Sequence, residues 1–66
     1  MDGRVSQKHG ADTVAQFCER HRISRAFLYV LWAQGRGPRY MQVGTRRLIS
    51  DEAAAAWRRQ MEIRAA

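Results

Sequence analysis

Hydrophobic side chains recur with a helical period in three segments of the chain and with a strand-like period in one. In the first helical segment, Val14, Phe17 and Cys18 are spaced i, i+3 and i+4. Thr13 followed by Gln16 is the capping-box pattern that starts a helix. The sequence therefore predicts a short helix that begins after Thr13 and ends at about residue 20 or 21.

A second helix is predicted after a short break at residues 21–23. Ser24 is an N-cap candidate, and Leu28, Leu31 and Trp32 share one face of a helix over about residues 25–34. Two glycines and Pro38 follow, and this segment cannot continue the helix.

The period changes to that of a strand between residues 39 and 49. Met41 and Val43 alternate with other side chains, and the Gly-Thr pair at 44–45 is a type II′ hairpin signal. A three-residue turn that includes Arg46 is also compatible with the sequence, so the register stays open.

A third helix is predicted after Ser50, which is again an N-cap candidate. Acidic residues occupy positions 51 and 52, and arginines occupy positions 58, 59 and 64, so the charges match the helix dipole at both ends. The apolar stripe of this helix consists of Ala53, Ala54, Trp57 and Met61.

The order of helix, tight turn, helix, basic hairpin and helix predicts a mostly α, small α+β fold of the winged helix-turn-helix type. It has three helices and a two-stranded β-hairpin wing between the second and third. Residues 1–11 are polar and predict a flexible arm, and residues 12–66 form the single domain. We expect the core to consist of Val14, Phe17, Ile23, Leu28, Leu31, Trp32, Trp57 and Met61.

Charge narrows the choice of partner. The 66 residues carry a net charge of +6, and 11 of the 12 basic residues are arginines. Residues 34–50 contain four arginines and no acid. A charge run is often only a solvated face, but this concentration of arginine in one segment favours a polyanionic partner.

Composition argues against several other classes of function. A single cysteine, Cys18, excludes an intramolecular disulfide and a thiolate zinc finger, and suits the cytoplasm. Cys18 and His21 can share a helix face, but only His9 or a carboxylate remains to complete a metal site, so we expect a buried structural cysteine. We expect no catalytic residues, no cofactor and no membrane span, since the longest apolar run is eight residues.

The chain resembles the excisionase and AlpA-type family of small regulators, whose domain is a MerR-like winged helix. The first part of the match comprises the segments Thr13-Val14-Ala15-Gln16-Phe17-Cys18, Ile23-Ser24-Arg25, Leu28-Tyr29 and Leu31-Trp32. The second part comprises Gly37-Pro38-Arg39-Tyr40, Val43-Gly44-Thr45-Arg46-Arg47-Leu48-Ile49-Ser50 and Ala56-Trp57. Together they cover about residues 12–62.

The resemblance implies a sequence-specific protein that binds double-stranded DNA. It places a recognition-helix face at Arg25, Ala26, Phe27, Tyr29 and Val30, and a wing tip at Thr45, Arg46 and Arg47. Backbone contacts are expected from Arg22, Ser24, Arg36 and Arg39. Such proteins assemble as several copies on tandem sites, bend the DNA and direct a tyrosine integrase toward excision.

Two alternatives remain open beside the excisionase role. A small transcriptional regulator would use the same winged-helix contacts, and a cationic protein-interaction module would not touch DNA at all. Salt dependence separates DNA binding from protein binding, and the location of the sites separates excision from transcription.

The sequence supports specific expectations for four of these residues. Arg46 and Arg47 are expected to be free for DNA, because adjacent arginines at a hairpin tip are not expected to contribute to the core. Phe27 is spaced i, i+4 from Leu31, which favours a core position, although an apolar recognition helix would read thymine methyls or shape. Arg22 stands where this family often has glycine, so a positive φ there would cost about 1 kcal/mol.

Overall fold

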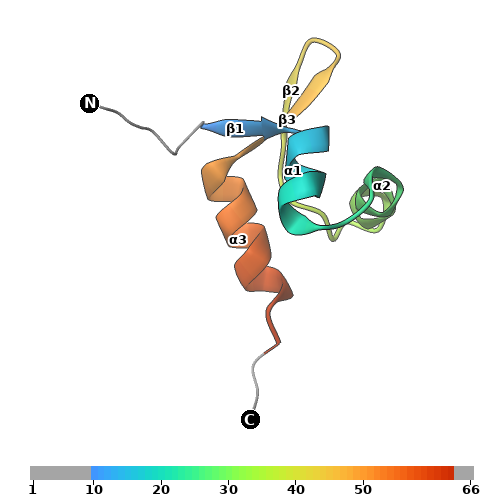
Figure 1. Cartoon of the computed structure of the whole chain (residues 1–66), viewed down its shortest axis with the longest axis vertical. Helices are drawn as coiled ribbons and strands as arrows, with labels where there is room; N and C mark the ends of the chain where they lie inside the picture. The colour runs from blue at the N-terminus through green and yellow to red at the C-terminus, as the bar shows by residue number, and fades with distance from the viewer. Residues whose placement is uncertain (1–9, 64–66) are drawn as a thin grey trace, which may run out of the picture.

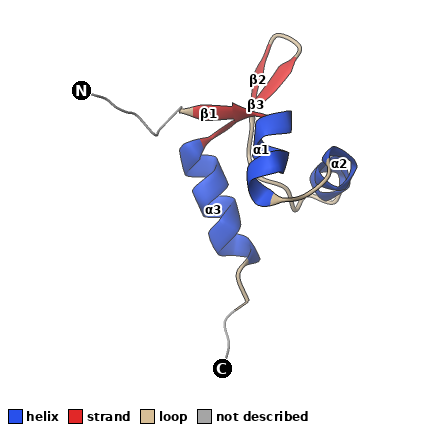
Figure 2. Cartoon of the chain, in the orientation of Figure 1, coloured by secondary structure: helices blue, strands red, loops and turns tan. Residues whose placement is uncertain are grey.

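The computed structural model describes residues 10–63, which form three helices and a three-stranded antiparallel sheet (Figure 1; Figure 2). In chain order the elements are β1 (Ala11–Thr13), α1 (Val14–His21), α2 (Arg25–Ala33), β2 (Met41–Val43), β3 (Arg46–Ser50) and α3 (Asp51–Met61). The three predicted helices and the predicted hairpin are confirmed, and the fold is a small α+β arrangement. The sheet has three strands, whereas the sequence predicted two.

The additional strand is β1, which pairs with β3 on the side opposite β2. Ala11 lies opposite Ser50, and Thr13 lies opposite Leu48. β1 has three residues and no alternation of hydrophobic side chains, and its pairing partner lies some 37 residues away in sequence. No local signal therefore marks it as a strand.

The predicted arm of residues 1–11 overlaps this strand at its C-terminal end. Ala11 belongs to β1, and the Asp51 backbone N–H donates to the Gly10 carbonyl at 3.0 Å. The Gly10 N–H in turn donates to the Asp51 carboxylate at 3.2 Å. Gly10 and Ala11 are thus fastened to the start of α3, and residues 1–9 lie outside the described part of the chain.

Each helix begins at the hydroxyl-bearing residue that the sequence predicts. The side-chain oxygens of Thr13, Ser24 and Ser50 accept the backbone N–H three residues ahead at 3.0–3.1 Å. Gln16 completes the capping box, because its side-chain oxygen accepts the Thr13 N–H at 3.0 Å. These bonds satisfy N–H groups that would otherwise lack partners at the helix ends.

The hairpin turn has two residues, which settles the register. Val43 pairs with Arg46 across the turn, so Gly44 and Thr45 form the loop. Gly44 has a φ of 64°, whereas Thr45 does not have a positive φ. A positive φ at the first loop position alone is what a type II′ turn requires, and glycine supplies it without steric cost.

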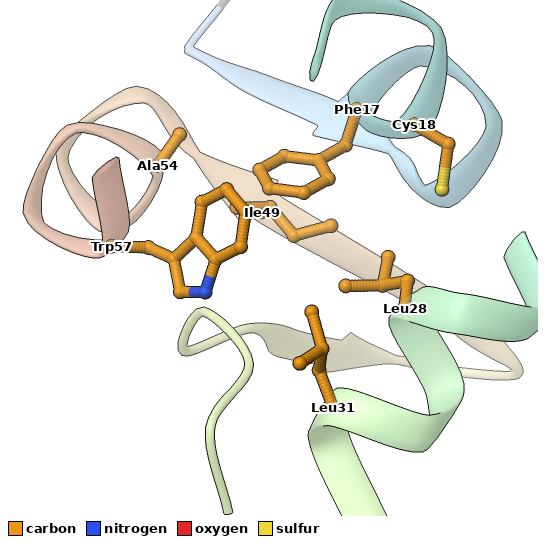
Figure 3. Packing of buried hydrophobic residues seen from close by; sticks show 7 residues of the cluster. All are labelled: Phe17, Cys18, Leu28, Leu31, Ile49, Ala54 and Trp57. Atoms are coloured by element: carbon orange, nitrogen blue, oxygen red, sulfur yellow. The ribbon is translucent and has the colours of Figure 1, made fainter. Parts of the chain in front are cut away.

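The core lies between the inner face of the sheet and the three helices (Figure 3). Phe17 points from α1 toward Ile49 of β3 and Trp57 of α3, and its ring meets the Trp57 ring edge-on at 5.3 Å. The cluster of buried hydrophobic residues comprises Phe17, Cys18, Leu28, Leu31, Ile49, Ala54 and Trp57. Four of these residues, Phe17, Leu28, Leu31 and Trp57, confirm the predicted core.

The other four predicted core residues lie at the margin of the cluster. Val14, Ile23, Trp32 and Met61 are partly buried and pack against it. Ile49 and Ala54 belong to the core but were not in the predicted set. Ile49 is buried because β3 is the central strand, a position that depends on pairing with β1.

Two indole N–H groups hold the connection between α2 and β2. Trp57 donates to the Arg36 carbonyl at 3.0 Å, and Trp32 donates to the Pro38 carbonyl at 2.7 Å. Gly37 lies between these acceptors, and a Cβ at this position would overlap the Trp32 indole. The connection therefore requires glycine at residue 37 because of close packing.

The turn between α1 and α2 contains a strained residue. Within residues 10–63, Arg22 is the only non-glycine residue with a positive φ, and its φ of 58° and ψ of 44° are left-handed. Its N–H donates to the Glu19 carbonyl at 3.4 Å, which closes the end of α1. The predicted departure from glycine at this position therefore carries the expected conformational cost.

Replacing Arg22 with glycine is expected to stabilise the fold by about 1 kcal/mol, because glycine adopts the left-handed region freely. For a domain of this size the melting temperature should rise by about 4–8 °C, measured by circular dichroism. Arg22→Ala is the matched control: it removes the same charge but keeps a Cβ, so it should give no comparable gain. An equal rise in both variants would attribute the effect to charge instead.

Candidate nucleic-acid interface

Basic and acidic side chains occupy different elements of the molecule. Residues 20–50, which contain α2 and the β2–β3 hairpin, include seven arginines and no Asp or Glu. The acids of the described region lie in β1, in α1 and around α3: Asp12, Glu19, Asp51, Glu52 and Glu62. The excess positive charge is therefore concentrated on α2, the hairpin and the segments that join them.

One of the seven arginines is paired with a buried acid. Asp12 is 2% exposed, and its carboxylate accepts a hydrogen bond from the Arg20 guanidinium at 2.9 Å. Arg20 remains half-exposed at the surface, so it supplies the charge and hydrogen bond that a buried carboxylate needs. This pair ties β1 to the end of α1, and sequence reasoning did not find it.

The start of α2 brings three of the predicted DNA-contact residues together. Arg25 is exposed in the first turn, and Arg22 is exposed in the turn before it. Ser24, predicted as a backbone contact, uses its hydroxyl oxygen to accept the Phe27 N–H at 3.0 Å. Two exposed guanidinium groups therefore flank a serine whose hydroxyl oxygen accepts a hydrogen bond within the protein.

The outer face of α2 carries apolar side chains. Phe27 is 50% exposed and Val30 is 48% exposed, and Ala26 is exposed beside them. The interpretation of Phe27 as a core residue is therefore wrong. The buried face is set by Leu28 and Leu31, and one residue along a helix is a rotation of about 100°, which moves Phe27 to the flank of that face.

The guanidinium of Arg47 lies among three aromatic rings. Its central carbon is 4.6 Å from the ring centroid of Tyr40, 5.0 Å from that of Trp32 and 5.1 Å from that of Tyr29. The rings also contact one another, with centroids 4.7 Å apart for Trp32 and Tyr40 and 5.1 Å apart for Tyr29 and Trp32. We refer to Tyr29, Trp32 and Tyr40 as the aromatic cage.

The aromatic cage joins the hairpin to α2. Tyr29 and Trp32 come from α2, whereas Arg47 comes from β3. Arg47 lies outside the buried core cluster, as expected, but it packs against these rings, which the sequence did not predict. Side chains alternate along a strand, so Arg47 shares a face with the buried Ile49, and this periodicity was the available signal.

Arg46 faces the other way and is exposed, because it precedes Arg47 in the same strand. A shallow groove of 330 Å³ lies beside the hairpin turn and brings four predicted residues together: Tyr29, Thr45, Arg46 and Arg47. Its opposite wall is the start of α1 at residues 13–15. The sequence did not predict that α1 contributes to this surface.

The remaining two predicted contacts, Arg36 and Arg39, lie in the connection between α2 and β2. The Arg36 carbonyl accepts from Trp57, and its guanidinium donates to the Gln34 side chain at 3.4 Å. Arg39 lines a different groove, next to Ala53 of α3. Both side chains are exposed, but neither lines the groove beside the hairpin turn.

Cys18 and His21 make their contacts within the fold. Cys18 is buried, and burial raises the pKa of its thiol, while the charge of Arg25 acts in the opposite direction. His21 stacks on Phe17 at 4.0 Å, and its Nδ1 lies 2.8 Å from the Phe17 carbonyl. Its Nε2 is 3.0 Å from the Arg58 guanidinium, and both contacts are satisfied when Nδ1 carries the proton.

Comparison of the chain with protein-family models, curated proteins and solved structures found no match. In the stretch from Gly10 to Ile63, no three His, Cys, Asp or Glu side chains cluster closely enough to hold a metal ion. None of the helices of this stretch has the length and hydrophobicity needed to cross a membrane.

Replacing Arg47 with alanine should lower the free energy of unfolding by about 1–2 kcal/mol, because it removes a cation from the aromatic cage together with its packed side chain. Arg47→Lys should recover only part of this loss, since an ammonium group cannot stack on the rings as a planar guanidinium does. Urea denaturation followed by tryptophan fluorescence provides the measurement, and Trp32 reports on the cage directly.

Arg46→Ala is the matched control for this experiment. It removes the same charge one residue away on the exposed side of β3, so we expect a change within about 0.5 kcal/mol. Equal destabilisation by both variants would contradict the role of the cage.

Proposed function

We propose that the protein binds double-stranded DNA as a winged helix-turn-helix module. The observation that carries this proposal is the segregation of charge: α2, the hairpin and the segments that precede and connect them, residues 22–50, hold six arginines without an acid. Phosphate contacts dominate the affinity of proteins for DNA, and an acid-free basic surface is the footprint of such contacts. The order of elements and the resemblance to excisionase-type domains support the same proposal.

In this proposal α2 enters the major groove and the hairpin acts as the wing. The major groove is about 12 Å wide, which admits a helix of about 10–12 Å in diameter. Arg22 and Arg25 at the start of α2 are exposed and suited to phosphate or base contacts. Thr45 and Arg46 at the turn of the hairpin are exposed and suited to the adjacent minor groove, where arginine is favoured.

Arg46 and Arg47 have different roles in this proposal. Its guanidinium occupies the aromatic cage, so it fixes the angle between the wing and α2. Two elements that enter neighbouring grooves must keep a set separation, because their docking geometry depends on it. Arg47 is thus proposed as a positioning residue, and Arg46 as a DNA contact.

The biological role proposed is that of an excisionase, on the basis of the resemblance. A single module of this size buries only about 600–1,000 Å² of its own surface against DNA, which limits its specificity. Several copies on tandem sites would therefore act together, bend the DNA at a cost of about 1–6 kcal/mol and assist a tyrosine integrase. Footprinting that finds adjacent direct repeats supports this role, whereas a single site over a promoter supports the transcriptional regulator.

DNA binding should weaken steeply with salt if the arginine surface contacts phosphates. For about four to six neutralised phosphates, log K should fall against log salt with a slope of about −4 to −5, measured by fluorescence anisotropy on a duplex. Arg46→Ala should weaken binding, reduce the slope by about 1 and leave the melting temperature unchanged. A shallow slope for the unaltered chain would instead support a protein partner.

Arg59→Ala provides the matched control. Arg59 is an exposed arginine of α3, outside the proposed interface, so its removal lowers the net charge by the same amount. We expect it to affect binding much less than Arg46→Ala. Equal losses would mean that overall charge, and not a defined surface, governs the interaction.

A further inference from the structure

The outer face of α2 is apolar although it is exposed. Phe27 and Val30 are each about half-exposed, and Ala26 is exposed next to them. The inner face of the same helix buries Leu28 and Leu31 in the core. A helix that buries one apolar face and exposes another is unusual for a free surface helix, so this outer face is a candidate contact surface.

The surroundings of this face favour a polyanion over an ordinary apolar protein surface. Arg25 lies at the start of the helix, Arg22 lies in the turn before it, and the nearest acids in sequence are outside residues 20–50. The partner must therefore present apolar groups within a strongly negative surface. The major groove of DNA does so, because thymine carries a C5 methyl group at the groove floor between two rows of phosphates.

Few hydrogen-bonding side chains remain on α2 for reading bases. The Ser24 hydroxyl oxygen accepts the Phe27 N–H and keeps only its own O–H as a donor at the start of the helix, and the Tyr29 ring belongs to the aromatic cage. Arg25 is then the main side chain of the first turn that can donate to a base edge. Polar readout along the rest of the helix is correspondingly limited.

We propose that α2 selects its DNA site through thymine methyl groups, which contact Phe27, Val30 and Ala26. The inference rests on the proposed function, since it requires α2 to enter the major groove. It makes Phe27 and Val30 specificity-determining residues, whereas Arg46 contributes affinity that is independent of sequence. The preferred site should accordingly contain several thymines in the half-site that α2 covers.

The test uses duplexes selected from a random-sequence pool by the full chain. In the selected duplex, each thymine is replaced in turn by deoxyuridine, which keeps the base pair and removes only the C5 methyl group. Burial of one such group corresponds to about a fourfold change in Kd. We expect losses of about three- to fivefold at two or more thymines, measured by fluorescence anisotropy at constant salt.

Protein variants assign the effect to α2. Phe27→Ala and Val30→Ala should each bring the ratio of Kd values for the uracil and thymine duplexes close to one at their own positions. Val43→Ala is the control, because Val43 is equally exposed but lies on the hairpin, and it should leave the ratios unchanged. Phe27 and Val30 are half-exposed, so their variants should keep a cooperative thermal transition, which circular dichroism checks.

The outcomes separate this inference from the proposed function. Unchanged Kd values for every uracil duplex, with steep salt dependence retained, would overturn thymine reading and leave DNA binding in place. Uracil sensitivity that persists in Phe27→Ala and Val30→Ala would overturn the assignment to these residues. Failure of the pool to yield any bound duplex would overturn the proposed function and this inference together.

Discussion

Pairing of β3 with β1 is the constraint on which the rest of the structure depends. It places Asp12 opposite Ile49 and Thr13 opposite Leu48, so α1 begins at a fixed point over the sheet. It also brings the Asp12 carboxylate to the interior, where Arg20 balances its charge. A slip of one residue would reverse the faces of β3: Ile49 would leave the core, and an arginine on the outer side would enter it. The register of one short central strand therefore decides which side chains the surface presents.

The second requirement is that the hairpin keeps its position relative to α2. Aromatic side chains meet this requirement at two points, through polar contacts as well as packing. The indole N–H groups of Trp32 and Trp57 hold two carbonyls of the connecting segment, and the aromatic cage holds the Arg47 guanidinium. A small domain buries little surface, so a few such contacts account for much of its rigidity. Tryptophan suits both tasks because it combines a large apolar area with one directional donor.

Local features of the fold could be predicted from the sequence, and features that depend on distant pairing could not. The caps at Thr13, Ser24 and Ser50 are encoded within a few residues and were predicted, whereas the two-residue turn at Gly44 was one of two alternatives that the sequence allowed. β1 was missed because three residues carry no period of their own. The arrangement around Arg47 was missed for a different reason: alternation along β3 puts Arg47 on the same face as Ile49, but that this face is the inner one follows from β3 being central. Among the predicted contact residues, Arg22 and Arg25 before and in α2 and Thr45 and Arg46 at the hairpin are exposed, whereas Arg47 is partly buried in the aromatic cage.

Departures from the rules of stable folding occur together in this molecule. Arg22 holds a left-handed conformation, Phe27 and Val30 expose apolar surface, and all three residues of β2 are exposed. In a chain of 66 residues the left-handed Arg22 costs a noticeable part of a small stability, and the exposed apolar side chains contribute little burial energy to it. The core, the caps and the Asp12–Arg20 pair follow these rules closely. The departures are therefore confined to particular elements and are not spread over the whole described chain. Departures that fall on α2, on the turn before it and on the hairpin mark the elements whose side chains serve something other than folding. The same elements lie in the acid-free, arginine-rich part of the chain, and this coincidence connects the energetic argument with the electrostatic one.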